Sequence, residues 1–390
     1  MNTMKPAPYY VKALAMAIPA MLIGIQIPTW LTFIPSRAVE LQADFRVLYT
    51  AGYMARTGQR LGLYNYPLVR EVQSRVIAND NAAVPFIHPA FETLIFAPLS
   101  LLSYRPAYLV WILMNCLLLG ITAWLLRPRV DALGELLPWL PAASLPSFFP
   151  ISFVIMQGQD SLLLLLVLLL AYRKIADHEL IAGLLLGLGL FRYQVLLPLL
   201  VLLLWWRAWK LILGCFVTSC GLMALSVAIA GISGQVQYFH ILQALAATPY
   251  LELTKRMVNI RGFVTSLGGG VPVTAVLSAI VMVAAAWRGA KQTVEQRFLL
   301  SISVSSLVAY HFFLHDLCIL ILPLLIALNR DLAKREWKNL AVASLVFSLP
   351  TVVWFANGSI YIMALGTLVL LLQQMMMGVE IVPHSAKNVT

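Results

Sequence analysis

The sequence predicts an all-α integral membrane protein of about 12 transmembrane helices, folded as a single polytopic domain over residues 1–390. Hydrophobic residues make up 61% of the chain and charged residues only 11%, and the mean hydropathy is +0.86. Soluble domains carry about 25% charged residues. Charge-free stretches such as 211–236 and 340–377 are long enough to cross a bilayer, and backbone in lipid must satisfy its own hydrogen bonds within helices.

The apolar runs define the expected spans. In order these are 11–34, 88–103, 106–126, 159–172, 180–192, 194–206, 211–231, 270–287, 298–311, 316–329, 338–356 and 359–376. The first is expected to be a retained span, because it is too long for a signal peptide and no A-x-A-like cleavage site follows it. Residues 136–157 contain four prolines, which predicts two short half-helices that together cross an even number of times.

Basic clusters at the ends of these runs set the orientation. They lie at 173–174, 207–210, 288–291 and 330–338, and the positive-inside rule places them, with both termini, on the cytoplasmic side of a cell membrane. The complementary segments 35–87, 232–268 and 311–316 then face outward. Arg127 and Arg129 would remain outside, against the rule.

The first outer segment is predicted to contain two short amphipathic helices on the membrane surface. Phe45, Tyr49 and Tyr53 share one helix face, and a second helix is expected to begin near Pro67. The segment 35–87 also carries six arginines and no lysine. Arginine suits phosphate recognition, although any one of them can simply reach toward lipid headgroups.

Several other classes are disfavoured. The four cysteines all lie in apolar runs, which suggests neither disulfides nor a metal cluster. The net charge of +11 does not indicate a nucleic-acid partner, because no soluble basic domain is present. Motifs of the H-E-x-x-H, G-x-S-x-G and Walker types are missing.

Polar residues from separate parts of the chain are all assigned to the outer membrane face, which predicts a shared outward-facing cavity. They are Asp44, His88, Gln157, Gln159, Asp160, Arg192, Gln194, Asn259, Arg261, His315 and Asp316. Structural explanations stay open for several of them. Asp44 can be a helix N-cap, His88 an interfacial residue, and His315–Asp316 a capped helix start. Arg192 favours function, since it is the one charge between Glu179 and Arg207.

In their order and spacing, the motifs resemble glycosyltransferase family 87, whose members use polyprenol-phosphate sugars. The resemblance covers roughly 40–330 and rests on ADFRVLYTAGYMARTGQRLGLYN, FIHPAFETLIFAPLSLLSYRPAYLVW, GQDSLLLLLVLLL, AGLLLGLGLFRYQVLLPLLVLLLWWR, NIRGF and HFFLHDLCILILP. Two departures stand out. Ala90 replaces a usual second proline, and Arg192 stands where a lysine is frequent.

The resemblance implies a type-C membrane glycosyltransferase fold and an inverting transfer of a hexose or pentose, with mannose favoured. The donor would be a polyprenyl-phosphate sugar and the acceptor a hydroxyl on a lipid or glycan. Asp44 would be the general base, and Arg192, Arg261 and Arg46 would bind the donor phosphate. The expected sugar or acceptor contacts are His88, Gln157, Gln159, Gln194, Asn259, His315, Asp316 and Tyr49. No cofactor is expected, and the reaction is expected to be metal-independent.

Three alternatives remain at this stage. A lipid or glycolipid flippase would show matching interrupted helices in two halves, a symmetry that the sequence lacks. A structural subunit of an envelope complex would leave the outer polar set unexplained. A ligase that transfers a finished glycan from a lipid pyrophosphate would use similar arginines.

Overall fold

The computed structural model describes residues 8–77, 83–247 and 251–376, and the regular secondary structure of this part of the chain is all helical, without strands. The main helices are α1 (Tyr9–Phe33), α3 (Phe45–Arg56), α4 (Tyr66–Val76), α6 (Tyr104–Leu126), α8 (Leu140–Ser147), α9 (Phe149–Gln157), α10 (Ser161–Lys174), α11 (Glu179–Gly187), α12 (Tyr193–Trp205), α13 (Trp209–Ala247), α15 (Ile260–Ser266), α16 (Val271–Gly289), α17 (Val294–Val308), α18 (Ile321–Lys334), α19 (Trp337–Phe355) and α20 (Met363–Met376). Shorter pieces are α2 (Ala38–Gln42), α5 (Thr93–Phe96), α7 (Asp131–Leu136), α14 (Leu251–Lys255), η1 (Arg60–Gly62), η2 (Ala90–Glu92), η3 (Leu99–Leu101), η4 (Arg127–Arg129), η5 (Leu188–Arg192), η6 (Asp316–Leu320) and η7 (Ile360–Ile362).

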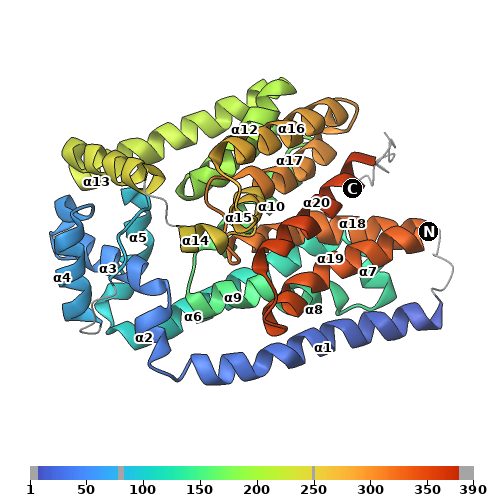
Figure 1. The fold of residues 1–390 in the computed structure, drawn as a ribbon, viewed down its shortest axis with the longest axis horizontal. Helices are drawn as coiled ribbons and strands as arrows, with labels where there is room; N and C mark the ends of the chain where they lie inside the picture. Colours follow the sequence, from blue (N-terminus) through green and yellow to red (C-terminus); the bar gives the residue numbers. More distant parts are fainter. Residues whose placement is uncertain (1–7, 78–82, 248–250, 377–390) are drawn as a thin grey trace, which may run out of the picture.

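Most long helices lie along one direction, with α2 to α5 at one end and both termini toward the other (Figure 1). Within the described residues, six stretches are long and apolar enough to cross a membrane, and a seventh is added if α8 and α9 count as one bent span. These helices make the chain a multi-pass membrane protein. Other apolar helices are shorter: α10, α18 and α20 have 14 residues each and α17 has 15.

The stretch 179–205 is long enough for one span, but its packing shows that the chain turns back at η5. A Cβ at Gly183 would collide with the carbonyl of Leu211, and one at Gly187 would lie 2.7 Å from the carbonyl oxygen of Cys215. A straight helix from 183 to 205 would separate its ends by about 33 Å, far too much for these contacts. Helices α11 and α12 therefore form a hairpin, as the separate runs 180–192 and 194–206 suggest, with Arg192 at its tip.

Residues 88–103 do not form the expected span. They make three short turns, η2, α5 and η3, because prolines at 89 and 98 prevent one continuous helix.

This correction changes the orientation of α6. The end of α6 meets the end of α10, since the Arg173 guanidinium donates to the Leu125 carbonyl, and Arg129 pairs with Glu295. Arg127 and Arg129 thus lie with the basic cluster, contrary to their expected outer position.

The prediction of two half-helices at 136–157 is confirmed. Helices α8 and α9 meet at an angle of 59°, where Phe148 has an extended backbone before Pro150. One bent crossing, rather than an even number, fits the corrected position of Arg129. Helix α1 covers this pair, and Gln26 donates to the Ser147 carbonyl over 3.1 Å.

The first expected outer segment contains α3 and α4, and α3 does not lie on a surface. Nine of its twelve residues are buried. Phe45 packs in an aromatic group with Tyr104, Tyr108 and Trp111. In the second expected outer segment, α13 continues to Ala247 through a bend at Gly231, where φ is +71°.

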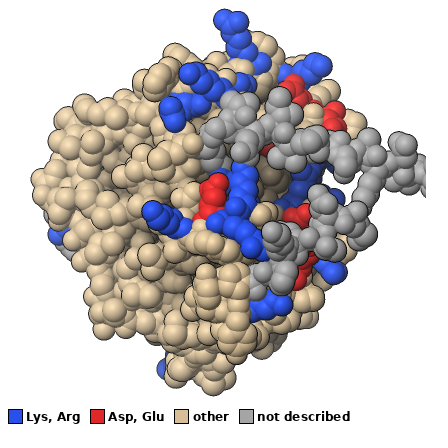
Figure 2. All heavy atoms as spheres, turned by 90° about the vertical axis from the view of Figure 1, so that its right-hand side faces the viewer, with Lys and Arg blue, Asp and Glu red and all other residues tan. Residues whose placement is uncertain are grey.

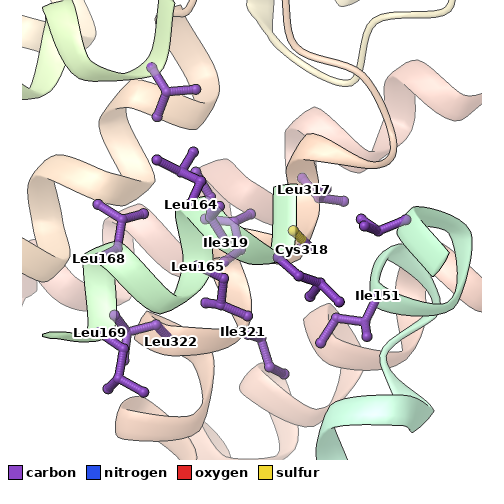
Figure 3. Packing of buried hydrophobic residues seen from close by; sticks show 14 of the residues in the cluster. Ile151, Leu164, Leu165, Leu168, Leu169, Leu317, Cys318, Ile319, Ile321 and Leu322 are labelled. Atoms are coloured by element: carbon purple, nitrogen blue, oxygen red, sulfur yellow. The ribbon is translucent and has the colours of Figure 1, made fainter. Parts of the chain in front are cut away.

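The buried core lies around α10, η6 and the start of α18. Figure 3 shows Leu164, Leu165 and Leu168 of α10 beside Ile319 and Cys318. At the end of the molecule that carries both termini, lysine and arginine side chains cluster with a few acidic ones (Figure 2). That is the end for which the sequence predicts a cytoplasmic position.

Candidate active site

The segment Gln157–Asp160 forms the turn between α9 and α10. Gly158 closes α9 with a φ of +64°, a left-handed conformation that glycine adopts without strain. An added Cβ there would lie 2.6 Å from the Cβ of Phe45. The indole Nε1 of Trp111 donates to the Gly158 carbonyl over 2.9 Å. This turn is therefore held rigidly against α3 and α6.

Asp44 lies immediately before α3, but its side chain does not cap that helix. Its Oδ2 instead accepts a 2.8 Å hydrogen bond from Nε2 of Gln159. The Asp44 backbone N–H donates to Oε1 of Gln157 over 3.2 Å. The two glutamines of the turn therefore position Asp44, so the capping explanation does not apply.

Arg192 is buried and extends from the hairpin tip into the same cluster. Its Nη2 donates to Oε1 of Gln159 over 2.6 Å and also to Oδ1 of Asp160. Its Nη1 lies 3.4 Å from Oδ1 of Asp316. A charge between two carboxylates at this depth satisfies the requirement that buried ions be paired.

Asp316 is fixed by groups around it. Its Oδ1 accepts from the Ser161 hydroxyl over 3.3 Å, and its Oδ2 accepts from the Phe313 backbone N–H over 3.0 Å. His315 is also buried, with Nε2 3.4 Å from the Asp316 carboxylate. The turn after α17 thereby joins the turn between α9 and α10 through Ser161 and Arg192.

His88 and Glu92 complete the cluster from the segment that was expected to be a span. Nδ1 of His88 lies 2.8 Å from Oε2 of Glu92 and 4.0 Å from Oδ2 of Asp160. Burial lowers the pKa of His88 to about 4. Burial, together with the neighbouring Asp160 charge, raises the pKa of Glu92 well above its usual range.

Glu92 was missed in the sequence, and Asp160 was noticed without a role. The signal for Glu92 was available, because His88 and Glu92 are four residues apart and can meet across one helical turn. The pair was overlooked because residues 88–103 were expected to form one continuous span.

The other expected site residues lie away from these contacts. Tyr49 is buried and donates its hydroxyl to the Leu102 carbonyl over 2.8 Å. Asn259 caps α15, accepting from the Gly262 N–H over 3.0 Å, and also donates to the Ala309 carbonyl over 2.6 Å. Arg261 donates to the Tyr310 carbonyl over 3.1 Å, and its guanidinium lies 3.9 Å from the centre of that ring.

Arg46 and Gln194 flank the cluster along the chain. Arg46 is buried on α3, two residues after Asp44. Gln194 is half-buried at the start of α12, two residues after Arg192.

The arrangement suits proton abstraction near a charged leaving group. One carboxylate, Asp44, is half-buried and oriented by an amide, which is how a general base is held in position. Behind it, Gln159 connects to a permanently charged guanidinium. Acyl-transfer chemistry would need an accessible serine or cysteine nucleophile beside a base, whereas Ser161, the serine of this cluster, is fully buried behind its contact with Asp316.

Comparison with known families supports the resemblance seen in the sequence. The model of glycosyltransferase family 87 matches residues 86–314, which is more than half of the 390 residues. The match contains His88, Asp160 and Arg192, whereas Asp44 precedes it and Asp316 follows it. No curated protein and no solved structure gives a significant match. The chain belongs to glycosyltransferase family 87 and is a membrane glycosyltransferase.

Proposed function

We propose that this enzyme transfers a hexose or pentose, with mannose favoured, from a polyprenyl-phosphate sugar to a hydroxyl of a lipid-linked or glycan acceptor, with inversion. The observation that carries the proposal is the Asp44 carboxylate, which is oriented by Gln159 and does not cap its own helix. A carboxylate fixed through one oxygen leaves the other to accept a proton from the attacking hydroxyl.

The attacking oxygen forms a bond to the anomeric carbon while the bond from that carbon to the phosphate oxygen breaks. The hydroxyl proton passes to Asp44, and polyprenyl phosphate leaves with the bonding electrons. A cation near the leaving phosphate stabilises its developing charge. Arg261 is our first choice for this role, because it is half-exposed and its contacts with Tyr310 leave its charge without a carboxylate partner among the described residues.

Arg192 is less suited to direct phosphate contact, since Asp160 and Asp316 already oppose its charge. It would reach the donor only by giving up one of these carboxylates. We therefore propose that Arg192 mainly anchors Gln159. Arg46 remains a secondary phosphate candidate on α3, and His315, Gln157 and Gln194 are proposed sugar contacts.

A transfer assay on purified protein in nanodiscs tests the reaction. Polyprenyl-phosphate mannose and related lipid-phosphate sugars serve as donors, and a lipid-pyrophosphate glycan tests the ligase alternative. We expect donor consumption by the wild type and a loss of about 10²–10⁴-fold in Asp44→Asn. Donor binding should survive in Asp44→Asn and weaken in Arg261→Ala. Full transfer by Asp44→Asn would contradict the base assignment.

We also propose the type-C fold and an orientation in a cell membrane, with both termini cytoplasmic and the site on the extracytoplasmic side. The basic end of the molecule supports this orientation. A single cysteine at exposed Thr57, in a background without the four native cysteines, should react with an impermeant maleimide in intact cells. One at exposed Asp177 should react only after permeabilisation. The reverse pattern would overturn the orientation.

A further inference from the structure

Three side chains with metal-binding groups converge behind the Gln157–Asp160 turn. His88 and Glu92 come from the segment around η2, and Asp160 comes from the turn itself. Their ligand atoms all lie within 4.8 Å of one another. Glu92 and Asp160 are fully buried, and the His88 side chain is 12% exposed. The imidazole is aimed inward through Nδ1, which is 2.8 Å from Glu92 and 4.0 Å from Asp160.

The cluster leaves two buried carboxylate oxygens without a hydrogen-bond donor. They are Oε1 of Glu92 and Oδ2 of Asp160, on side chains that are 0% exposed. An unsatisfied buried acceptor is costly, and it is most costly when it carries charge. Two such oxygens, in a cluster whose ligating atoms lie within 4.8 Å of one another, would be satisfied by a positively charged partner.

A bound cation would also balance the charge of the cluster. Glu92, Asp160 and Asp316 are three buried carboxylates, whereas Arg192 is the one guanidinium that pairs with them among the contacts of the described residues. With all three acids ionised and His88 neutral, the cluster carries a net charge of −2. Uncompensated charge of this size is strongly disfavoured inside a protein.

We propose that His88, Glu92 and Asp160 bind a divalent cation, with Nδ1 of the imidazole and one oxygen of each carboxylate as ligands. One imidazole with two carboxylates suits Zn²⁺ or Mn²⁺ better than Mg²⁺, which prefers oxygen ligands and keeps several waters. The cation neutralises the −2 charge and satisfies both unpaired oxygens.

The position of the cation lets it hold the turn between α9 and α10 in place. Oδ1 of Asp160 binds Arg192 and Oδ2 faces the proposed cation, so one carboxylate joins both positive groups. Such secondary contacts orient metal ligands. The cation thereby fixes the turn that carries Gln159, and through it Asp44. This site goes beyond the proposed transfer chemistry, in which the cation takes no part, although it departs from the expectation of a metal-free protein.

A proton is the competing occupant. If Glu92 is protonated, its hydroxyl can donate to Asp160, and no metal is needed to satisfy the two oxygens. Both occupants fit two facing carboxylates, but only the cation makes the protein retain metal and respond to chelators. The two explanations therefore separate in measurements that do not involve sugar transfer.

The experiment uses the full chain, purified without a histidine tag. Metal content is measured after dialysis, and the melting temperature is measured with a chelator and after addition of Zn²⁺, Mn²⁺ or Mg²⁺. Wild type should retain about one equivalent of Zn²⁺ or Mn²⁺, melt at a lower temperature after chelation, and recover with either ion. Glu92→Gln should lose both the retained metal and the response. His178→Ala, which removes an exposed imidazole elsewhere, should behave as wild type.

Wild type without retained metal, and with no larger melting response to Zn²⁺ or Mn²⁺ than Glu92→Gln, would overturn the proposal in favour of the shared proton. If Glu92→Gln fails to fold, the wild-type metal content and chelator response decide alone. Failure of the transfer assay would leave these readouts unaffected, so the two proposals can fail separately.

Discussion

Gln159 donates its side-chain amide to the Asp44 carboxylate over 2.8 Å, across 115 positions of the sequence. The carbonyl of the same amide accepts from Arg192 over 2.6 Å. An amide has one acceptor and one donor end, so the Arg192 contact fixes which end faces Asp44. This chain of three residues determines how the proposed base is oriented.

Replacing Gln159 with leucine should therefore lower kcat with little change in KM. Hydrogen bonds to charged groups contribute about 1.5–3 kcal/mol, which corresponds to a rate loss of roughly 10- to 100-fold if the whole effect is expressed in the transition state. Steady-state transfer kinetics measure it. Gln243→Leu removes an exposed amide on α13 and should be neutral. An unchanged kcat in Gln159→Leu would show that Asp44 needs no such support.

Removing the charge of Arg192 should destabilise the fold as well as the site. Arg192→Gln leaves Asp160 and Asp316 buried without their counter-ion, and breaking a buried pair costs about 3–5 kcal/mol. Thermal unfolding should detect this loss. Arg192→Lys keeps the charge but loses the planar fork that reaches three acceptors, so its loss should be intermediate.

The matched control is Arg129→Gln. Arg129 pairs with Glu295 over 3.0 Å, but both side chains are about a quarter exposed, and exposed pairs contribute about 0–1 kcal/mol. Equal destabilisation by Arg129→Gln and Arg192→Gln would mean that burial does not set the cost.

Close packing of α11 on α13 predicts a strong effect at Gly183. A Cβ at this position would collide with the Leu211 backbone, which cannot move as a side chain can, so Gly183→Ala should cost about 1–3 kcal/mol or more. Gly120 on α6 is also helical, but a Cβ there meets nothing within 4 Å. Gly120→Ala should be neutral or stabilising by up to about 1 kcal/mol. Similar melting temperatures for the two variants would contradict the observed packing.

The class of the protein and several members of the cluster, though not Glu92, follow from apolar runs and isolated polar residues. Arg192 was recognisable because one charge inside a long apolar run is expensive, and the structure gives that charge two carboxylates. The half-helices α8 and α9 were recognisable from proline spacing. Both signals come from residues that are close together in the sequence, so the sequence alone shows them.

What the sequence could not give was the pairing between distant segments. Asp44 is a plausible cap by sequence, and only the position of Gln159 shows that its carboxylate is used elsewhere. Residues 88–103 have the composition of a span, yet they fold as short turns, because proline positions and tertiary contacts outweigh hydropathy there. That single misassignment also reversed the expected side of Arg129.

Acid should weaken the fold through His311, which lies in the turn after α17. Burial, reinforced by the charge of Arg261, lowers the pKa of His311 to about 4, against the opposing effect of Asp316. In the unfolded chain a histidine has a pKa of about 6.5, so the unfolded state binds more protons between these values. The stabilisation is therefore complete above about pH 6.5 and is lost as the pH falls through about 4.

Melting temperatures measured from pH 7.5 to 4 should show this decline in wild type and a shallower one in His311→Gln. His178 is exposed, so His178→Gln should follow wild type. If the melting temperature of His311→Gln declines as steeply with acid as that of wild type, protonation of His311 does not cause the loss of stability.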